Sequence, residues 1–156
     1  MARLGRAILV PTILATSLVV SGIFAQESAT VWNGEPIIFE KADGAEPTAA
    51  ENQDRITENV WITRGNNGGE IYNAAIEDGS TKGVRPRGTE WALGSTEELG
   101  SLEFEPFRAA VGSPKDVVGK ELVLHLIESD IYVDVEFTAW SQQRRGGFAY
   151  RRATPE

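Results

Sequence analysis

The feature that most constrains the fold is the ten-residue stretch IYVDVEFTAW at residues 131–140, in which apolar and polar side chains alternate. Its apolar members are Ile131, Val133, Val135, Phe137 and Ala139. Successive side chains of a strand point to opposite faces, so this period of two predicts a strand with one buried and one wet face. An apolar run at 122–127 precedes it across the short connection 128–130. Together the two segments predict a β-hairpin.

Short β-type runs separated by turn residues fill most of the remaining chain. They lie at 30–32, 36–40, 59–64, 70–72, 91–93, 101–104 and 148–150. Polar stretches at 42–54 and 77–90 are predicted as exposed loops, and no long stretch after residue 25 has helical periodicity. The pattern predicts an all-β fold, an antiparallel sandwich or jelly-roll-like domain of about seven to nine strands.

Three local signals refine this prediction. Asn33-Gly34 favours the positive φ angles of a tight hairpin turn between the first two runs. Pro36 cannot donate a ladder hydrogen bond, so its strand should begin there or lie at a sheet edge. Ser113-Pro114 predicts a single helical turn.

The N-terminal 25 residues have the order of a cleavable secretory signal peptide. Arg3 and Arg6 precede an uncharged, mostly apolar stretch that ends at Ala25. An uncleaved membrane anchor is the alternative, because the 18 residues from 7 to 24 approach the length of a spanning helix. The sequence thus predicts a leader at 1–25, a single domain at 26–156 with no membrane-spanning segment, and a secreted product, periplasmic or extracellular.

Charge and composition exclude several classes of function. The chain has 23 acidic and 15 basic residues, and losing the two arginines of the leader takes the net charge from −8 to −10. Such an acidic surface argues against binding to nucleic acid or anionic membranes, which Lys and Arg must neutralise. The chain has no cysteine, so disulfides, thiol catalysis and thiolate metal sites are excluded.

Four blocks of sequence carry a family resemblance. They are DRITENVWITRGNNGGEIYN (54–73), GTEWALG (88–94), VGKELVLHLIESDIYVDVEFTAW (118–140) and GGFAYRR (146–152). Their order resembles that in a family of uncharacterised secreted bacterial proteins. The resemblance implies an extracellular β-domain and assigns no activity, cofactor or catalytic residue.

Catalytic signals are weak, and no catalytic residue is predicted. His125 is the only histidine, and no G-x-S-x-G nucleophile motif accompanies it; a histidine packed in or beside the core is the simpler interpretation. Asp134 and Glu136 share a strand face at a spacing that suits glycoside hydrolysis. Acids on one strand face are more commonly the wet side of a sheet.

The candidate ligand-binding residues are Arg64, Asn66, Asn67, Trp91 and Trp140. The glycine- and asparagine-rich block 64–69 brings backbone amides close to an approaching ligand, and Arg64 adds a planar set of donors. Plain hairpin geometry explains the same block. Trp91 and Trp140, if exposed together, would form a platform for sugar rings, whereas core packing is the commoner fate of tryptophan.

Carboxylates favour calcium over zinc or copper, so calcium is the metal that this composition allows. One candidate cluster is Glu128, Asp130 and Asp134, and a second comprises Asp43, Glu46, Glu51 and Asp54. Neither matches an EF-hand loop. Solvated acidic loops are the alternative interpretation.

The last 15 residues are basic, with four arginines and one acid. The arginines are Arg144, Arg145, Arg151 and Arg152. They predict either pairing with the acidic body or self-association of copies through opposite charge. The favoured function is therefore non-catalytic binding to carbohydrate or another envelope component; a self-associating structural protein of a matrix or fibre, and a polysaccharide-active enzyme, are the alternatives.

Cleavage of the leader is directly testable. When the full chain is expressed in a secreting host, the exported protein should begin at Gln26, because Ala25 is the small residue at the predicted cut. Intact-mass measurement and N-terminal sequencing check this. An exported or membrane-bound product that still begins at Met1 would establish the anchor instead.

Overall fold

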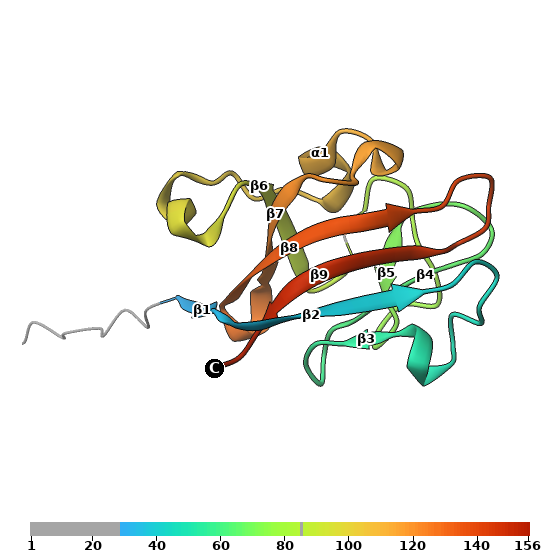
Figure 1. Cartoon of the computed structure of the whole chain (residues 1–156), viewed down its shortest axis with the longest axis horizontal. Helices are drawn as coiled ribbons and strands as arrows, with labels where there is room; N and C mark the ends of the chain where they lie inside the picture. Colours follow the sequence, from blue (N-terminus) through green and yellow to red (C-terminus); the bar gives the residue numbers. More distant parts are fainter. Residues whose placement is uncertain (1–28, 85) are drawn as a thin grey trace, which may run out of the picture.

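The computed structural model describes residues 29–84 and 86–156, and the predicted signal peptide lies outside this part of the chain. Nine strands form two sheets (Figure 1). The larger sheet contains β1 (Thr30–Trp32), β2 (Gly34–Lys41), β6 (Thr89–Leu93), β7 (Glu121–Leu126), β8 (Ile131–Trp140) and β9 (Phe148–Thr154). The smaller sheet contains β3 (Asp54–Arg55), β4 (Trp61–Arg64) and β5 (Ile71–Asn73). The all-β, sandwich-like fold that the sequence predicts is confirmed.

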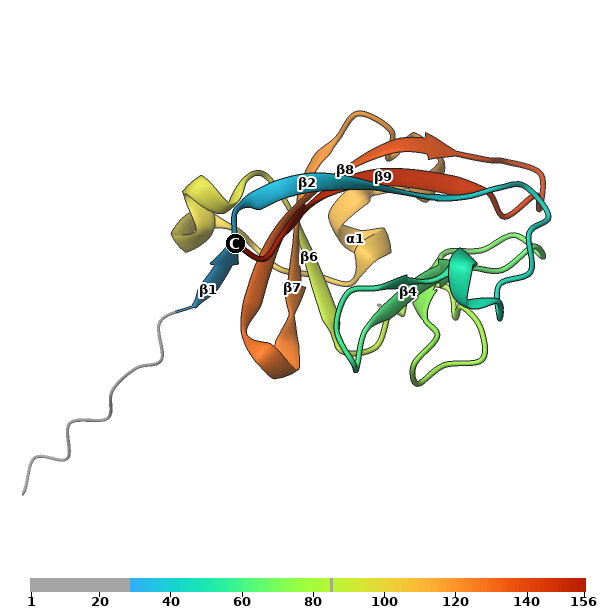
Figure 2. The same ribbon diagram turned by 60° about the horizontal axis from the view of Figure 1, so that its bottom comes forward.

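The large sheet has the order β2-β9-β8-β7-β6, with β1 added beside β8. In Figure 2 the strands β2, β9 and β8 run above β4 of the small sheet. Side chains from both sheets and from the short helix α1 (Phe107–Val111) form one hydrophobic core between them. Within the described residues no helix has the length and apolarity that crossing a membrane requires.

Four 3-10 turns complete the secondary structure. They are η1 (Ala50–Asn52), η2 (Thr96–Ser101), η3 (Pro114–Asp116) and η4 (Ile127–Ser129). The helical turn predicted at Ser113-Pro114 is confirmed, although the Ser113 side chain makes no capping hydrogen bond. A strand predicted at 101–104 is wrong, because η2 occupies the start of this segment and only Glu105 bridges to Trp91.

The hairpin predicted from residues 122–140 is present as β7, η4 and β8. Its antiparallel register places Leu122 beside Val135 and Leu124 beside Val133. All four side chains are buried, as the alternation predicts. The hairpin supplies the centre of the large sheet, since β9 and β6 extend it on its two sides.

A β-bulge reverses the alternation near the end of β8. Phe137 pairs with Tyr150 and Ala139 pairs with Ala149, so Thr138 is the extra residue. Beyond it Ala139 is exposed, and Trp140 packs against the core, with its ring centroid 5.9 Å from that of Phe137. The expectation of a buried Ala139 and an outward-facing Trp140 is therefore wrong.

The hairpin predicted at Asn33-Gly34 is also wrong. β1 runs parallel to β8, and β2 pairs antiparallel with β9. Gly34 has no positive φ; instead a Cβ there would lie 2.3 Å from the Pro155 carbonyl oxygen. Glycine is needed at this position because the two chain segments approach too closely for any side chain.

One residue of a predicted loop lies in the interior of the molecule. Asp54, predicted in an exposed loop, belongs to β3 and is buried. Its Oδ2 accepts hydrogen bonds from the Tyr150 hydroxyl at 2.7 Å and from Arg152 Nε at 2.6 Å, while Oδ1 accepts from Arg152 Nη2 at 2.9 Å. One carboxylate thus joins the small sheet to β9 of the large sheet.

This buried cluster shifts the titration of its members. Burial and the adjacent Asp54 charge raise the pKa of the Tyr150 hydroxyl well above its usual value. Desolvation opposes the charged form of Arg152, but the hydrogen bonds and charge of Asp54 outweigh it and raise the pKa of Arg152. Tyr150 thus stays neutral and Arg152 stays charged across the physiological range.

Asp54→Asn should lower the free energy of unfolding by about 3–5 kcal/mol, because it leaves the buried Arg152 guanidinium without its counter-charge. Urea denaturation at neutral pH measures this loss. Glu51→Gln, at an exposed acid of the same segment, is the matched control and should change stability by no more than about 0.5 kcal/mol. Equal effects of the two substitutions would contradict the structural role of the Asp54 cluster.

Candidate functional site

A groove in the described part of the chain has a volume of about 420 Å³. It lies where β1 and β9 meet end to end along the same side of β8, since β1 reaches Val133 and β9 begins its pairing at Val135. Its lining includes a tryptophan, four acids and an arginine: Trp32, Glu35, Glu121, Asp134, Glu136 and Arg151.

The floor of the groove comes from the outward-facing positions of three adjacent strands. Glu121 pairs with Glu136, and Glu136 pairs with Arg151, so the three side chains form a row across β7, β8 and β9. Arg151 Nη2 lies 3.6 Å from Glu136 Oε2, and more than 40% of each side chain is exposed. A guanidinium and several carboxylates thus face solvent inside one depression.

Asp134, beside this row, has a structural role. Its two carboxylate oxygens accept hydrogen bonds from the Thr96 backbone NH at 2.8 Å and from the Thr96 hydroxyl at 2.7 Å. They hold the start of segment 96–105 against the outer face of the large sheet. Both carboxylate oxygens of Asp134 are therefore already engaged in hydrogen bonds within the domain.

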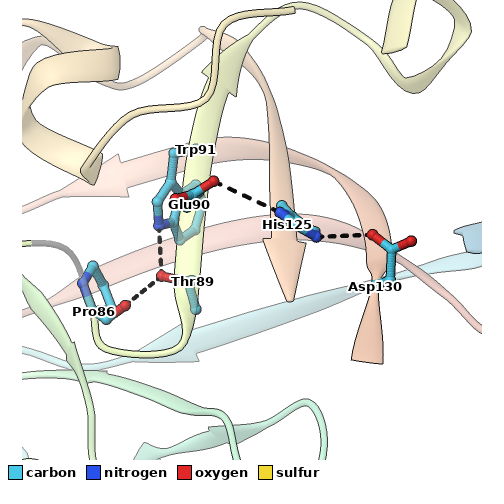
Figure 3. A network of polar contacts seen from close by, with 6 residues as sticks. All are labelled: Pro86, Thr89, Glu90, Trp91, His125 and Asp130. Carbon is cyan, nitrogen blue, oxygen red and sulfur yellow. Dashed lines mark hydrogen bonds and ion pairs between the residues drawn. The ribbon is translucent and has the colours of Figure 1, made fainter. Parts of the chain in front are cut away.

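His125 lies further along this face, in the network of Figure 3. Its Nε2 is 3.1 Å from Asp130 Oδ1, and its Nδ1 is 3.8 Å from Glu90 Oε2. The imidazole stacks on the Tyr132 ring with centroids 4.3 Å apart. Both ring nitrogens of His125 thus face carboxylates. This is the environment of a half-buried histidine that packs beside the core, which is the simpler interpretation of the sequence.

Segment 96–105 covers this histidine as well. The Phe104 ring meets both His125 and Tyr132 edge-on, with centroids 5.7 and 5.5 Å away. Burial and the hydrogen bond to Asp130 raise the pKa of Tyr132. The aromatic cluster therefore anchors the end of the segment whose beginning Asp134 holds.

The predicted tryptophan platform is wrong. Trp91 is 0% exposed, and its indole NH donates to the Thr89 hydroxyl, which in turn donates to the Pro86 carbonyl (Figure 3). Trp140 is half-buried with the Arg64 guanidinium 3.9 Å above its ring. Neither indole offers a free face to a sugar, because one is in the core and the other is covered.

Arg64 is likewise a structural residue and not a ligand-binding rim. It is 3% exposed, and its Nη1 donates to the carbonyl oxygens of Ser141 at 2.8 Å and Gly147 at 2.9 Å. Its Nε donates to Gly69. Burial lowers the pKa of Arg64 to about 10. These bonds fasten the 65–69 turn to the loop after β8.

Asn66 completes the same fastening. It accepts from Lys41 Nζ at 2.9 Å and donates to the Ala45 carbonyl at 2.9 Å. Gly146 passes so close that a Cβ there would lie 2.2 Å from Asn66 Oδ1. Of the predicted ligand-binding residues in this block, Arg64, Asn66 and Asn67, only Asn67 is exposed, so plain hairpin geometry explains the block.

The predicted calcium clusters are dispersed. Glu128 accepts from Asn59 and Asp130 contacts His125, while Asp134 holds Thr96. In the first loop, Asp43 faces Arg145 and Asp54 is buried with Arg152. No group of three His, Asp or Glu side chains within the described residues is arranged to hold a metal ion.

The basic tail is largely paired within the molecule. Arg145 lies 3.7 Å from Asp43, Arg151 lies 3.6 Å from Glu136, and Arg152 is buried against Asp54. Arg144 is exposed. Self-association through the four arginines is therefore not supported, because Arg152 is inaccessible and two others already face acids of the same domain.

Sequence reasoning missed the groove itself. Glu35 and Glu121 carry no signal in the sequence, and Trp32 belongs to the predicted strand at 30–32 without any predicted role. The groove forms because β1 occupies the place that β9 leaves beside β8, and this depends on a parallel pairing between residues about a hundred positions apart. No local pattern reports such a pairing.

Asp134→Ala should lower the free energy of unfolding by about 1–3 kcal/mol, because it leaves the Thr96 donors without their acceptor. Hydrogen exchange should also accelerate across 96–105. Glu136→Ala, two positions along on the same face, should cost less than about 1 kcal/mol because its ion pair is exposed. Urea denaturation and exchange mass spectrometry distinguish the two; equal behaviour would refute the anchoring role.

Comparison of the chain with protein-family models, with curated proteins and with solved structures finds no match. The resemblance of its sequence blocks to secreted bacterial β-domains therefore stays a prediction. Function has to be inferred from the geometry and charge of the groove.

Proposed function

We propose that the protein is a secreted, non-catalytic module that binds carbohydrate in the groove between β1, β8 and β9. The observation that carries this proposal is the exposed pair of Arg151 and Glu136 within the groove, with Trp32 also in its lining. The predicted signal peptide supports a site of action outside the cytosol, where glycans of the envelope and the medium are the abundant ligands.

The polar groups of the groove suit sugar hydroxyls. A hydroxyl both donates and accepts, a carboxylate only accepts and a guanidinium only donates. Glu136 and Arg151 therefore satisfy two neighbouring hydroxyls of one ring in complementary ways, and Glu35 and Glu121, both exposed, add further acceptors. Trp32, half-buried beside them, supplies apolar surface for the C–H groups of the ring.

The charge of the groove narrows the class of glycan. Three exposed or half-exposed glutamates accompany a single exposed arginine there, and the whole domain is acidic. Polymers of uronic acids or phosphodiesters would be repelled. The proposed ligand is therefore an uncharged glycan, with or without amide groups on its sugars.

Binding without hydrolysis is the better-supported chemistry. Hydrolysis by two carboxylates requires one as acid and the other as base or nucleophile. Of the predicted pair, Asp134 accepts two hydrogen bonds from Thr96 and Glu136 faces Arg151. Both carboxylates thus have partners that keep them in place as acceptors.

The test is retention on insoluble polysaccharides, with cellulose and chitin as neutral and amide-bearing supports and cross-linked polygalacturonate as an acidic one. The wild-type protein should be retained on a neutral support and pass the acidic one. Arg151→Ala and Glu136→Gln should each weaken binding about tenfold or more, because each removes a charge-assisted hydrogen bond.

Glu103→Gln is the matched control, since Glu103 is an exposed acid outside the groove, and it should bind like the wild type. Thermal unfolding curves must show that all variants stay folded. Retention unchanged by both groove substitutions, or no retention on any support, would overturn the proposal.

A further inference from the structure

We propose that the protein forms a symmetric dimer in which the free edge of β2 pairs antiparallel with β2 of a second copy. This inference does not rest on the proposed carbohydrate binding: Ile37 and Ile38, which carry it, lie outside the lining of the groove, although Ile38 pairs with the groove residue Arg151 on the neighbouring strand. The strand order β2-β9-β8-β7-β6 of the large sheet ends at β2 on one side and at β6 on the other (Figure 1).

The border at β6 is capped by the chain itself. The Trp91 backbone NH donates to the Glu105 carbonyl at 2.9 Å, and the Glu105 NH donates to the Trp91 carbonyl at 2.8 Å. Glu105 therefore occupies ladder positions that a further strand would need. Covering an edge in this way is how proteins prevent unwanted strand pairing.

The border at β2 is long and open. β2 spans eight residues, and β9 is its only strand partner within the described chain. Ile38 is 71% exposed and Ile37 is 42% exposed. Consecutive residues point to opposite faces, so apolar side chains are exposed on both faces of this edge. An edge strand that carries such residues is a ready template for another strand.

One antiparallel self-pairing matches the sequence of β2. When Ile38 lies opposite Ile38 of the second copy, Ile37 lies opposite Phe39 and Pro36 lies opposite Glu40. Glu35 then lies opposite Lys41, whose side chain is buried against Asn66 of its own molecule. Apolar side chains then face apolar side chains on both faces of the sheet, and no acid faces an acid. Cross-strand apolar pairs are the unit of sheet stabilisation.

The neighbouring registers are poorer. A shift of one residue would oppose side chains that point to different faces, which an antiparallel pair does not allow. A shift of two in one direction places Phe39 opposite Glu35, and a shift of two in the other direction places Ile38 opposite Glu40. The β2 sequence GEPIIFEK is therefore complementary to itself in the register centred on Ile38. This favours a second copy of the chain over an unrelated strand, because a twofold axis makes each favourable pair away from the axis occur twice.

Sedimentation velocity over a concentration series is the first test. The wild-type protein should show a concentration-dependent dimer, and Ile38→Lys should raise its dissociation constant about a hundredfold, because one substitution removes two apolar side chains and places two like charges together. Ile76→Lys, at a similarly exposed isoleucine away from the edge strands, is the control and should dimerise like the wild type.

Cross-linking tests the register. The chain has no cysteine, so Ile38→Cys introduces a single thiol that should form a disulfide-linked dimer under mild oxidation, whereas Ile76→Cys should not. A wild-type protein that stays monomeric up to about 1 mM, or a dimer that Ile38→Lys leaves unchanged, would overturn the proposal. A dimer weakened by Ile38→Lys but not cross-linked through Cys at 38 would refute the Ile38-centred register.

Discussion

The buried carboxylate of Asp54 is the interaction on which the arrangement of the two sheets depends. It accepts one hydrogen bond from the Tyr150 hydroxyl and two from the Arg152 guanidinium. Tyr150 and Arg152 lie 96 and 98 positions away from Asp54 along the chain. A charge buried between sheets is tolerated only when its partners are in place. The cluster therefore admits one placement of the small sheet against β9, while the surrounding apolar core would tolerate small displacements.

The same logic extends to the rim of the molecule. Arg64, Lys41 and Asn66 join the turn after β4 to the loop between β8 and β9, so the second end of the sandwich is also closed by polar bonds to backbone. In this small acidic domain without cysteine, buried cations bonded to carbonyl oxygens do the cross-linking that disulfides do elsewhere. Arg64 and Arg152, which look like surface charge in the sequence, are consequently part of the interior.

How well each feature can be predicted from the sequence depends on how far apart along the chain the residues that form it lie. The β7–β8 hairpin was predictable because its alternation and its turn are contiguous. The bulge at Thr138 was not, since one added residue depends on the partner strand, and it exchanges the faces of Ala139 and Trp140. Asp54 looked like a loop acid because its partner is remote. Trp91 looked available for the same reason: the helix and strands that bury it come from other parts of the chain.

The parallel pairing of β1 with β8 has a consequence for how the chain reaches this structure. The first two strands are completed by β8 and β9, so the large sheet has a high contact order and closes only after the last quarter of the polypeptide is present. A chain that emerges from a translocation pore N-terminus first would hold β1 and β2 unpaired until its final residues appear. Folding would then coincide with release, which keeps the polypeptide in the extended form that passage through such a pore requires.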